Sequence, residues 1–392
     1  MLPEIPGLGT RLAENPLITP SDVIPSQPGF EVVCAFNPAA IRIDATIILL
    51  LRVAERPRGD LPLSVRDQEL IAGPAGWRFR RPLELPHRED VVRLAVFDPE
   101  GDPPGVVPAF IRRDTPGLVV GDSRSLSFQG RALLSQLSHL RLARSADGVH
   151  FDVMATPALA PLGALEEYGC EDPRVTPLDG VYYLTYVAPS RNGIVTCLAV
   201  TRDFATFSRL GVMFLPDHKD VVLFPEQVGG QYWALTRPMP STFDKVHGIW
   251  IAHSPDLVHW GGHQPLALPR WGLWDAVRTG GSNVPIRTED GWLVLYHGVN
   301  HHGRYCMGAL LLDENNPYRV LARLQRPLLS PEAPYERRGF YSNVVFSCGH
   351  VPLTADGSTI RVFYGAADHV TAAADFDVEA ILDAFRHDEL PH

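Results

Sequence analysis

A repeated pattern constrains the fold of this chain more than any other feature of its sequence. Each copy has a hydroxyl residue, a spacer, an Asp and then an aromatic residue four positions later, and the Asp residues are Asp147, Asp203 and Asp256. A weaker copy contains Asp313, so successive Asp residues are 56, 53 and 57 positions apart. Self-similarity with a period of about 50 residues is typical of stacked β-units such as propeller blades.

Two interleaved sets of apolar runs predict the strands of each repeat. One set directly precedes the copies, at residues 139–144, 196–200, 249–252 and 307–310. The other set is rich in aromatic and β-branched residues, in three of its members after a glycine, at residues 179–184, 230–235, 290–295 and 360–364. A glycine before such a run indicates a turn followed by a strand. The clearest helical pattern is confined to residues 378–385.

These repeats predict an all-β fold, a five-bladed β-propeller with a short C-terminal helix. Four units run from about residue 130 to residue 368, and residues 30–56 supply further strands. We expect one domain over 1–392, with 1–29 as an N-terminal extension and 374–392 as a C-terminal helical tail. The 36 prolines and 33 glycines fit the many turns of such a fold, whereas the Pro-rich segment 58–130 has no assigned structure.

The repeated Asp and aromatic residues are interpreted as structural. An Asp in a turn accepts hydrogen bonds from backbone N–H groups, and the aromatic side chain packs between neighbouring blades. Function should therefore lie where the repeats differ from one another.

Composition excludes several classes of partner. The net charge of −10 argues against nucleic acid or an anionic membrane, although a small anionic ligand remains compatible. The sequence has no run of 18 apolar residues and no signal-like start, so a cytoplasmic protein is expected. The cysteines are odd in number and without a CxxC pair, which predicts buried thiols; they are Cys34, Cys170, Cys197, Cys306 and Cys348. No metal site is expected, because the adjacent His301 and His302 are better explained as loop residues.

Non-repeated charged residues gather at the ends of predicted strands. In a propeller these ends meet at the axis, which would bring together Asp172, Lys219, Arg237, Arg278 and His297. One carboxylic acid facing several cations suits acid-assisted transfer to a phosphate, since Arg and Lys both bind phosphate oxygens. Each residue also has a plainer interpretation: the cations as surface ion-pair members, and His297 as a hydrogen-bonded core histidine.

At these residues the sequence resembles glycoside hydrolase family 130, the inverting β-mannoside phosphorylases and related β-mannosidases. The resemblance runs from about residue 36 to residue 368. The matching segments are Phe36–Ala39, Leu51–Arg56, Ser138–Ser145, Glu171–Arg174, Lys219–Asp220, Leu223–Pro225, Arg237–Pro238, Trp274–Asp275, Tyr296–Gly298, Asn343–Phe346 and Tyr364–Asp368.

The resemblance implies a role for each site residue. Asp172 would be the catalytic acid, acting through a mannose hydroxyl, and α-mannose 1-phosphate would form with inversion. The positions implied for phosphate binding are Lys219, Arg237, Arg278 and His297. Those implied for substrate binding are Asn37, Arg52, Glu171, Asp275 and Asp368. Inorganic phosphate would be the co-substrate of a β-manno-oligosaccharide, either β-1,2- or β-1,4-linked. No other cofactor is implied, and homo-oligomerisation is left open.

Two alternatives stay open at this point. The segment Gly280–Pro285 departs from the phosphorylase pattern, and an inverting β-mannosidase could use Glu226 or Asp275 to activate water. A non-catalytic carbohydrate-binding propeller could instead stack sugars on Trp271, Trp274 and Tyr305. The motifs around Ser138–Ser145 and Arg304–Cys306 favour the β-1,2-mannoside branch.

Overall fold

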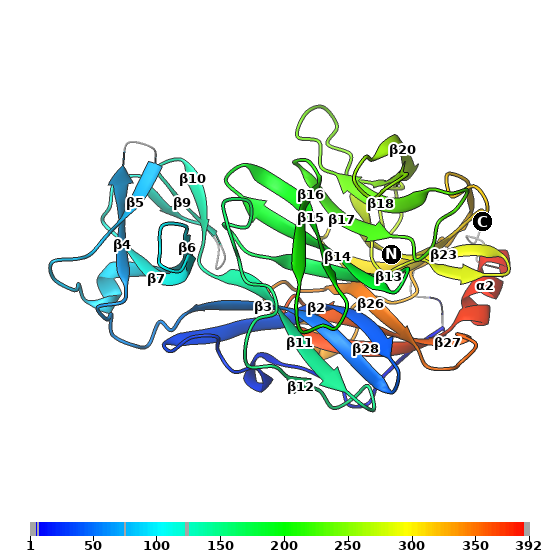
Figure 1. The fold of residues 1–392 in the computed structure, drawn as a ribbon, viewed down its shortest axis with the longest axis horizontal. Coiled ribbons are helices and arrows are strands. Elements are labelled where there is room, and N and C mark those ends of the chain that lie inside the picture. Colours follow the sequence, from blue (N-terminus) through cyan, green and yellow to red (C-terminus); the bar gives the residue numbers. More distant parts are fainter. Residues whose placement is uncertain (1–4, 6–7, 74–75, 122–124, 388–392) are drawn as a thin grey trace.

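Five antiparallel sheets make up most of the computed structural model, which describes residues 5, 8–73, 76–121 and 125–387 (Figure 1). The first sheet contains β2 (Phe30–Ile43), β3 (Thr46–Pro57), β11 (Leu137–Ser145) and β12 (Asp152–Val153). The second contains β13 (Glu171–Leu178), β14 (Val181–Ser190), β15 (Gly193–Thr201) and β16 (Ser208–Phe214). The third contains β17 (His218–Leu223), β18 (Tyr232–Pro238), β19 (Ile249–Ser254) and β20 (Gly261–Ala267).

The last two sheets follow the same order along the chain. The fourth contains β21 (Arg278–Gly281), β22 (Ile286–Thr288), β23 (Gly291–Val299), β24 (Tyr305–Leu312) and β25 (Val320–Arg323). The fifth contains β26 (Val345–Pro352), β27 (Thr359–Ala366), β28 (Val370–Asp377) and, on the outer side of β28, β1 (Gly9–Arg11). The fifth sheet thus combines strands from both ends of the chain.

Helices are few and short. They are α1 (Pro334–Arg337), α2 (Val378–His387) and the 3-10 turns η1 (Pro20–Asp22) and η2 (Arg88–Asp90). The predictions of an almost entirely β fold and of a helix over 378–385 are therefore confirmed.

The unassigned segment 58–130 and the residues directly after it contribute the strands of two further sheets, which lie to one side of the five (Figure 1). One contains β4 (Gln68–Gly73), β5 (Gly76–Arg80), β6 (Val91–Asp98) and β7 (Gly105–Arg112), and the other β8 (Leu118–Val120), β9 (Ser125–Phe128) and β10 (Arg131–Leu134). They are inserted between β3 and β11, which pair with each other from Leu137 opposite Glu55 onwards. The first sheet is therefore completed by β11 and β12, which follow the two inserted sheets in the chain.

A separate apolar core lies between each sheet and the next. Leu50 and Tyr186 join the first and second sheets, and Phe214 and Leu223 the second and third. Similar clusters join the third to the fourth, the fourth to the fifth and the fifth to the first, where Phe363 packs with Leu49. Burial of apolar surface in these five clusters stabilises the arrangement of the sheets.

The repeated pattern has the structural role predicted for it. Oδ1 of Asp147 accepts hydrogen bonds from the backbone N–H groups of Val149 and His150 at 2.8 and 2.9 Å, and Asp203 and Asp256 do the same in their own turns. The aromatic Phe151 packs edge-on against Phe363 of the fifth sheet, with 5.7 Å between ring centroids.

Candidate active site

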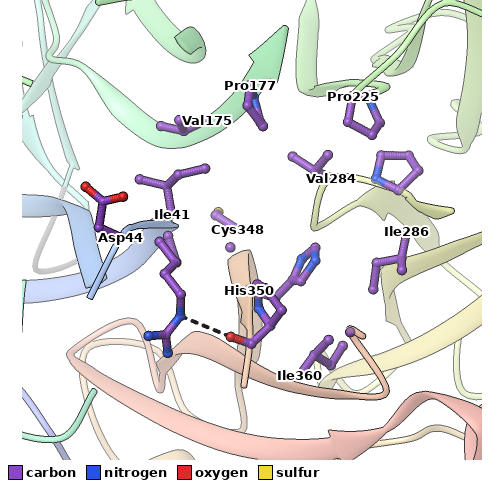
Figure 2. Close-up of a pocket in the computed structure, with 16 residues that line it drawn as sticks. Ile41, Asp44, Val175, Pro177, Pro225, Val284, Ile286, Cys348, His350 and Ile360 are labelled. Carbon is purple, nitrogen blue, oxygen red and sulfur yellow. Dashed lines mark hydrogen bonds between the residues drawn. The ribbon is translucent and has the colours of Figure 1, made fainter. Parts of the chain in front are cut away.

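Two cavities are lined by the first strands of the five sheets, which are β2, β13, β17, β21 and β26, and by residues shortly after them. One cavity of about 440 Å³ is lined by the earlier residues of these strands, such as Asn37, Asp172 and Lys219. The other, of about 490 Å³, is lined by later residues such as Ile41 and Val175 (Figure 2). The second lining is largely apolar, whereas the first is rich in charged groups. We call the first one the polar cavity.

The polar cavity receives its side chains from a recurring irregularity of the strands. Asn37, Asp172 and Asp220 each lie in a β-bulge of a first strand, with φ of +46°, +44° and +53°. Asn and Asp adopt this left-handed conformation more readily than other side-chain-bearing residues. A bulge re-aims a side chain and is common beside active sites. At all three positions the residue is therefore of a type that suits its left-handed backbone conformation.

Asp172 is buried at the wall of the polar cavity and is held by two donors. Its Oδ1 accepts hydrogen bonds from Nδ2 of Asn37 and from a guanidinium nitrogen of Arg52, both at 2.9 Å. Arg52 also pairs with Glu171 at 2.7 Å and donates to Ser138 Oγ at 3.0 Å. Oδ2 of Asp172 has no hydrogen-bond partner among the residues that the structure describes.

The charges around Asp172 control its ionisation. Burial alone would raise the pKa of Asp172, but the positive charges of Arg52, Lys219 and Arg174 and the hydrogen bond from Asn37 lower it to about 2. The carboxyl group is consequently ionised at neutral pH when the cavity holds no ligand. Any anion bound beside the same cations would push this pKa upwards.

Cations and carboxylates are balanced in number in the lining of the polar cavity. The cations are Arg52, Lys219, Arg237 and Arg278, and the carboxylates are Glu171, Asp172, Asp220 and Asp368. Arg52 is paired with Glu171 and Asp172, and Arg237 with Asp220 at 2.7 Å. Within the described part of the chain, Lys219 and Arg278 have no carboxylate at ion-pair distance; Arg278 donates to Tyr305 Oη at 3.1 Å. Two cations of the cavity are therefore available to an anionic ligand.

Asp220 holds the basic side chains of the polar cavity in place. Its buried carboxylate pairs with Arg237 at 2.7 Å and Arg174 at 3.2 Å, and lies 3.3 Å from Nε2 of His297. Burial would raise the pKa of Asp220, but the charges of Arg237 and Arg174 and the hydrogen bond with His297 hold it well below its usual range. Asp220 was not among the predicted site residues. The available signal was its position next to Lys219, and in the structure it lies in the same kind of bulge as Asn37 and Asp172.

His297 lies behind the cavity lining. It is fully buried, and burial lowers its pKa to about 4, so the ring is neutral at pH 7. Arg237 lies 3.1 Å from its Nε2, and Ser282 Oγ 3.3 Å from its Nδ1. A Cβ on Gly280 would lie 2.4 Å from Asp220 Oδ2 and 2.5 Å from the His297 ring, so only glycine fits there. His297 therefore orients Arg237 and does not line the cavity.

Two of the predicted residues lie elsewhere. Asp275 is completely buried, and its Oδ2 accepts from Arg270 at 2.9 Å, Arg323 at 2.6 Å and Tyr296 Oη at 2.8 Å. Glu226 is exposed and pairs with Arg287 at 2.8 Å. Neither carboxylate lines the polar cavity, whereas Asn37, Arg52, Glu171, Asp172, Lys219, Arg237, Arg278 and Asp368 all do.

An aromatic wall completes the cavity. Tyr305, Tyr341 and Phe346 line it. Phe346 also packs against the His297 ring, with 4.5 Å between centroids. Of these three residues, only Tyr305 was among those predicted to stack on sugars. Aromatic rings facing charged groups provide a surface for the apolar face of a sugar.

Two kinds of feature are absent from the residues that the structure describes. No group of three or more His, Cys, Asp or Glu side chains is arranged to hold a metal ion. No helix has the length and apolar character needed to cross a membrane.

Comparison with known proteins connects this chain to a family. Residues 126–387 match a family model described as beta-1,4-mannooligosaccharide phosphorylase. A β-1,2-mannobiose phosphorylase of Listeria innocua is 39% identical over 373 residues, covering 95% of this chain and 97% of the relative. A 1,2-β-oligomannan phosphorylase of Thermoanaerobacter sp. is 37% identical over 62% of this chain and 80% of that relative.

The structural comparison agrees with the sequence comparison. The solved complex of the Listeria innocua β-1,2-mannobiose phosphorylase with β-1,2-mannobiose superposes with a TM-score of 0.82 and 37% identity, covering 96% of this chain and 99% of that one. The family model and the close relatives together establish the relationship. The chain belongs to glycoside hydrolase family 130, a family of enzymes that act on β-mannosides.

Proposed function

We propose that this enzyme is an inverting phosphorylase that cleaves β-1,2-linked manno-oligosaccharides with inorganic phosphate and releases α-mannose 1-phosphate. The observation that carries the proposal is the polar cavity. It combines a buried carboxylate, Asp172, with two cations, Lys219 and Arg278, that have no carboxylate partner in the described residues. The choice of β-1,2 linkage is supported by the relative that matches nearly the whole chain, a β-1,2-mannobiose phosphorylase.

The five sheets are then the blades of a five-bladed propeller in a single domain. Each first strand, together with the residues shortly after it, runs from the polar cavity to the apolar one, and the fifth sheet packs against the first. In such a fold the polar cavity is one mouth of the central axis. Each blade contributes a short stretch of strand to it, which explains how residues far apart in sequence meet.

The reaction breaks one bond and forms one. Phosphate, held by Lys219, Arg237 and Arg278, attacks the anomeric carbon of the terminal mannosyl unit from the face opposite the leaving group. The bond from that carbon to the glycosidic oxygen breaks, and the proton of Asp172 passes to that oxygen through a mannose hydroxyl. Arg fits phosphate through a planar pair of donors, and Lys acts as a point charge. Phosphate is itself the nucleophile, so the reaction needs no metal and no organic cofactor.

Phosphate also prepares Asp172 for its role as an acid. In the free enzyme the surrounding cations lower the pKa of Asp172 to about 2. A bound phosphate neutralises part of that positive charge, which raises the pKa of the carboxyl group. Asp172 can then take up a proton when phosphate and mannoside are both bound.

Phosphorolysis is favoured over hydrolysis by the positions of the two alternative bases. A water-activating base must reach the sugar from the face opposite the acid. Asp275 has three donors on one oxygen, and Glu226 is exposed beside Arg287. Neither lines the polar cavity, so neither is placed to activate water there.

The test measures cleavage of β-1,2-mannobiose with and without phosphate. We expect mannose 1-phosphate to accumulate only when phosphate is present. Asp172→Asn should reduce turnover at least about a hundredfold, the low end for loss of a positioned general acid. Glu226→Gln is the matched carboxylate control and should retain wild-type turnover. Release of two mannose molecules at the same rate without phosphate would refute the proposal.

A further inference from the structure

One exposed aromatic side chain lies outside the machinery described so far. Of the three aromatic residues considered for sugar stacking, Trp274 is buried and Tyr305 lines the polar cavity. Trp271, in contrast, is 88% exposed. A single exposed apolar side chain is common on protein surfaces, so the significance of Trp271 depends on what holds it and what lies beside it.

Trp271 is presented by a well-anchored turn. The backbone N–H of Leu273 donates to the carbonyl oxygen of Arg270 at 3.2 Å, which closes the turn around Trp271. The guanidinium of Arg270 is bound to Asp275 at 2.9 Å and to the carbonyl oxygen of Leu324 at 2.8 Å. The buried Asp275 thus holds this turn in place, and little conformational freedom remains to be lost when a ligand contacts the indole.

The indole of Trp271 borders the rim of the polar cavity. Its ring lies edge-to-face against His301, with 5.3 Å between centroids and 66° between planes. His301 belongs to the turn between β23 and β24, where the N–H of Gly303 donates to the carbonyl oxygen of Asn300 at 3.0 Å. Gly303 lines the cavity, as do Val299 and Tyr305 on either side of this turn. Trp271 and His301 therefore form an aromatic ledge directly outside the cavity.

We propose that this ledge is an outer sugar-binding subsite that takes a further mannosyl unit of a longer β-manno-oligosaccharide. The inference rests on the proposed function and extends it to chain length. The polar cavity is at the small end of the usual range for ligand pockets, so a longer chain must continue beyond its rim. A β-mannopyranose presents axial C–H groups on one ring face, and these pack against the electron-rich face of an indole.

The test compares short and long substrates in two variants and one control. For wild type, Trp271→Ala and Trp271→Phe, kcat/KM is measured with β-1,2-mannobiose, mannotriose and mannotetraose at saturating phosphate. We expect Trp271→Ala to reduce the ratio of the long-substrate to the mannobiose value about tenfold, and Trp271→Phe to restore most of it. Leu210→Ala removes another exposed apolar side chain, on the outermost strand β16, and should leave the ratio unchanged.

Binding measurements separate this inference from the proposed function. Calorimetric titration of the same oligosaccharides should show tighter binding of the longer ones to wild type, and loss of that gain in Trp271→Ala. This result would hold even if cleavage proved independent of phosphate. Equal chain-length dependence in wild type and Trp271→Ala, in both binding and kinetics, would overturn the subsite.

Discussion

Arg52 holds two carboxylates together at the polar cavity, and its removal should destabilise the fold in a pH-dependent way. The substitution Arg52→Met keeps the length of the side chain and removes its charge. In the wild type, the guanidinium of Arg52 pairs with Glu171 at 2.7 Å and Asp172 at 2.9 Å and donates to Ser138 at 3.0 Å, and all these residues are buried. Removing one partner of such a buried group leaves uncompensated charge and costs about 3–5 kcal/mol.

The pH dependence follows from the direction of the pKa shift. In wild type the pKa of Asp172 is about 2, below its unfolded value, so its contribution to stability is present above about pH 4 and is lost as pH falls through about 2. In Arg52→Met the carboxylate of Asp172 loses its main cation, and the pKa of Asp172 rises. The variant therefore gains protons between neutral pH and about pH 4.5, and its deficit in stability shrinks.

Urea unfolding at neutral pH and at about pH 4.5 checks both expectations. Arg56→Met serves as the control, because Arg56 forms a half-exposed pair with Glu31 and should change stability by less than about 1 kcal/mol. A deficit for Arg52→Met that is below about 1 kcal/mol, or that is the same at both pH values, would contradict the description of this cluster.

Three further substitutions test other parts of the site. Arg278→Met should raise KM for phosphate about tenfold or more and KM for the mannoside by less, because Arg278 has no carboxylate partner in the described residues. Equal effects on the two KM values would count against an anion site. Gly365→Ala should reduce kcat without preventing folding. The added Cβ would lie 1.9 Å from Asn37 Oδ1 and would displace the side-chain amide of Asn37, which donates to Asp172. A wild-type kcat would show that this hydrogen bond is dispensable. Asp275→Asn should destabilise the protein by about 3 kcal/mol in thermal or urea unfolding, and a selective rise in KM for mannoside at unchanged stability would instead place Asp275 in the site.

The local parts of the fold were predictable because their signals are local. The turns at Asp147, Asp203 and Asp256 depend on hydrogen bonds within a few residues, and the strands beside them have clear apolar patterns. The inserted sheets of 58–136 were not predictable in the same way. Four of their strands have only three to five residues, and prolines are frequent in the loops between them. The insert also separates β3 from its partner β11, so that pairing depends on contacts far apart in sequence.

The same difference between local signals and long-range contacts applies to the candidate site. Lys219 and Arg237 were selected by their positions at strand ends, and they are directly opposite each other on β17 and β18. Sequence could not distinguish a residue that lines the cavity from one behind it, as with Arg237 and His297. Asp220 was missed because its pairing with two arginines depends on the fold. In the sequence it is simply an Asp that follows a Lys.

The most direct test of the central claim follows the oxygen atoms of phosphate. The enzyme is incubated with β-1,2-mannobiose and phosphate carrying a heavy oxygen isotope, and the first product is analysed by mass spectrometry and NMR. Phosphorolysis at the polar cavity predicts α-mannose 1-phosphate that retains every labelled oxygen, including the one bonded to the anomeric carbon. Free mannose as the first product, with no label transferred to the sugar, would contradict the proposed reaction.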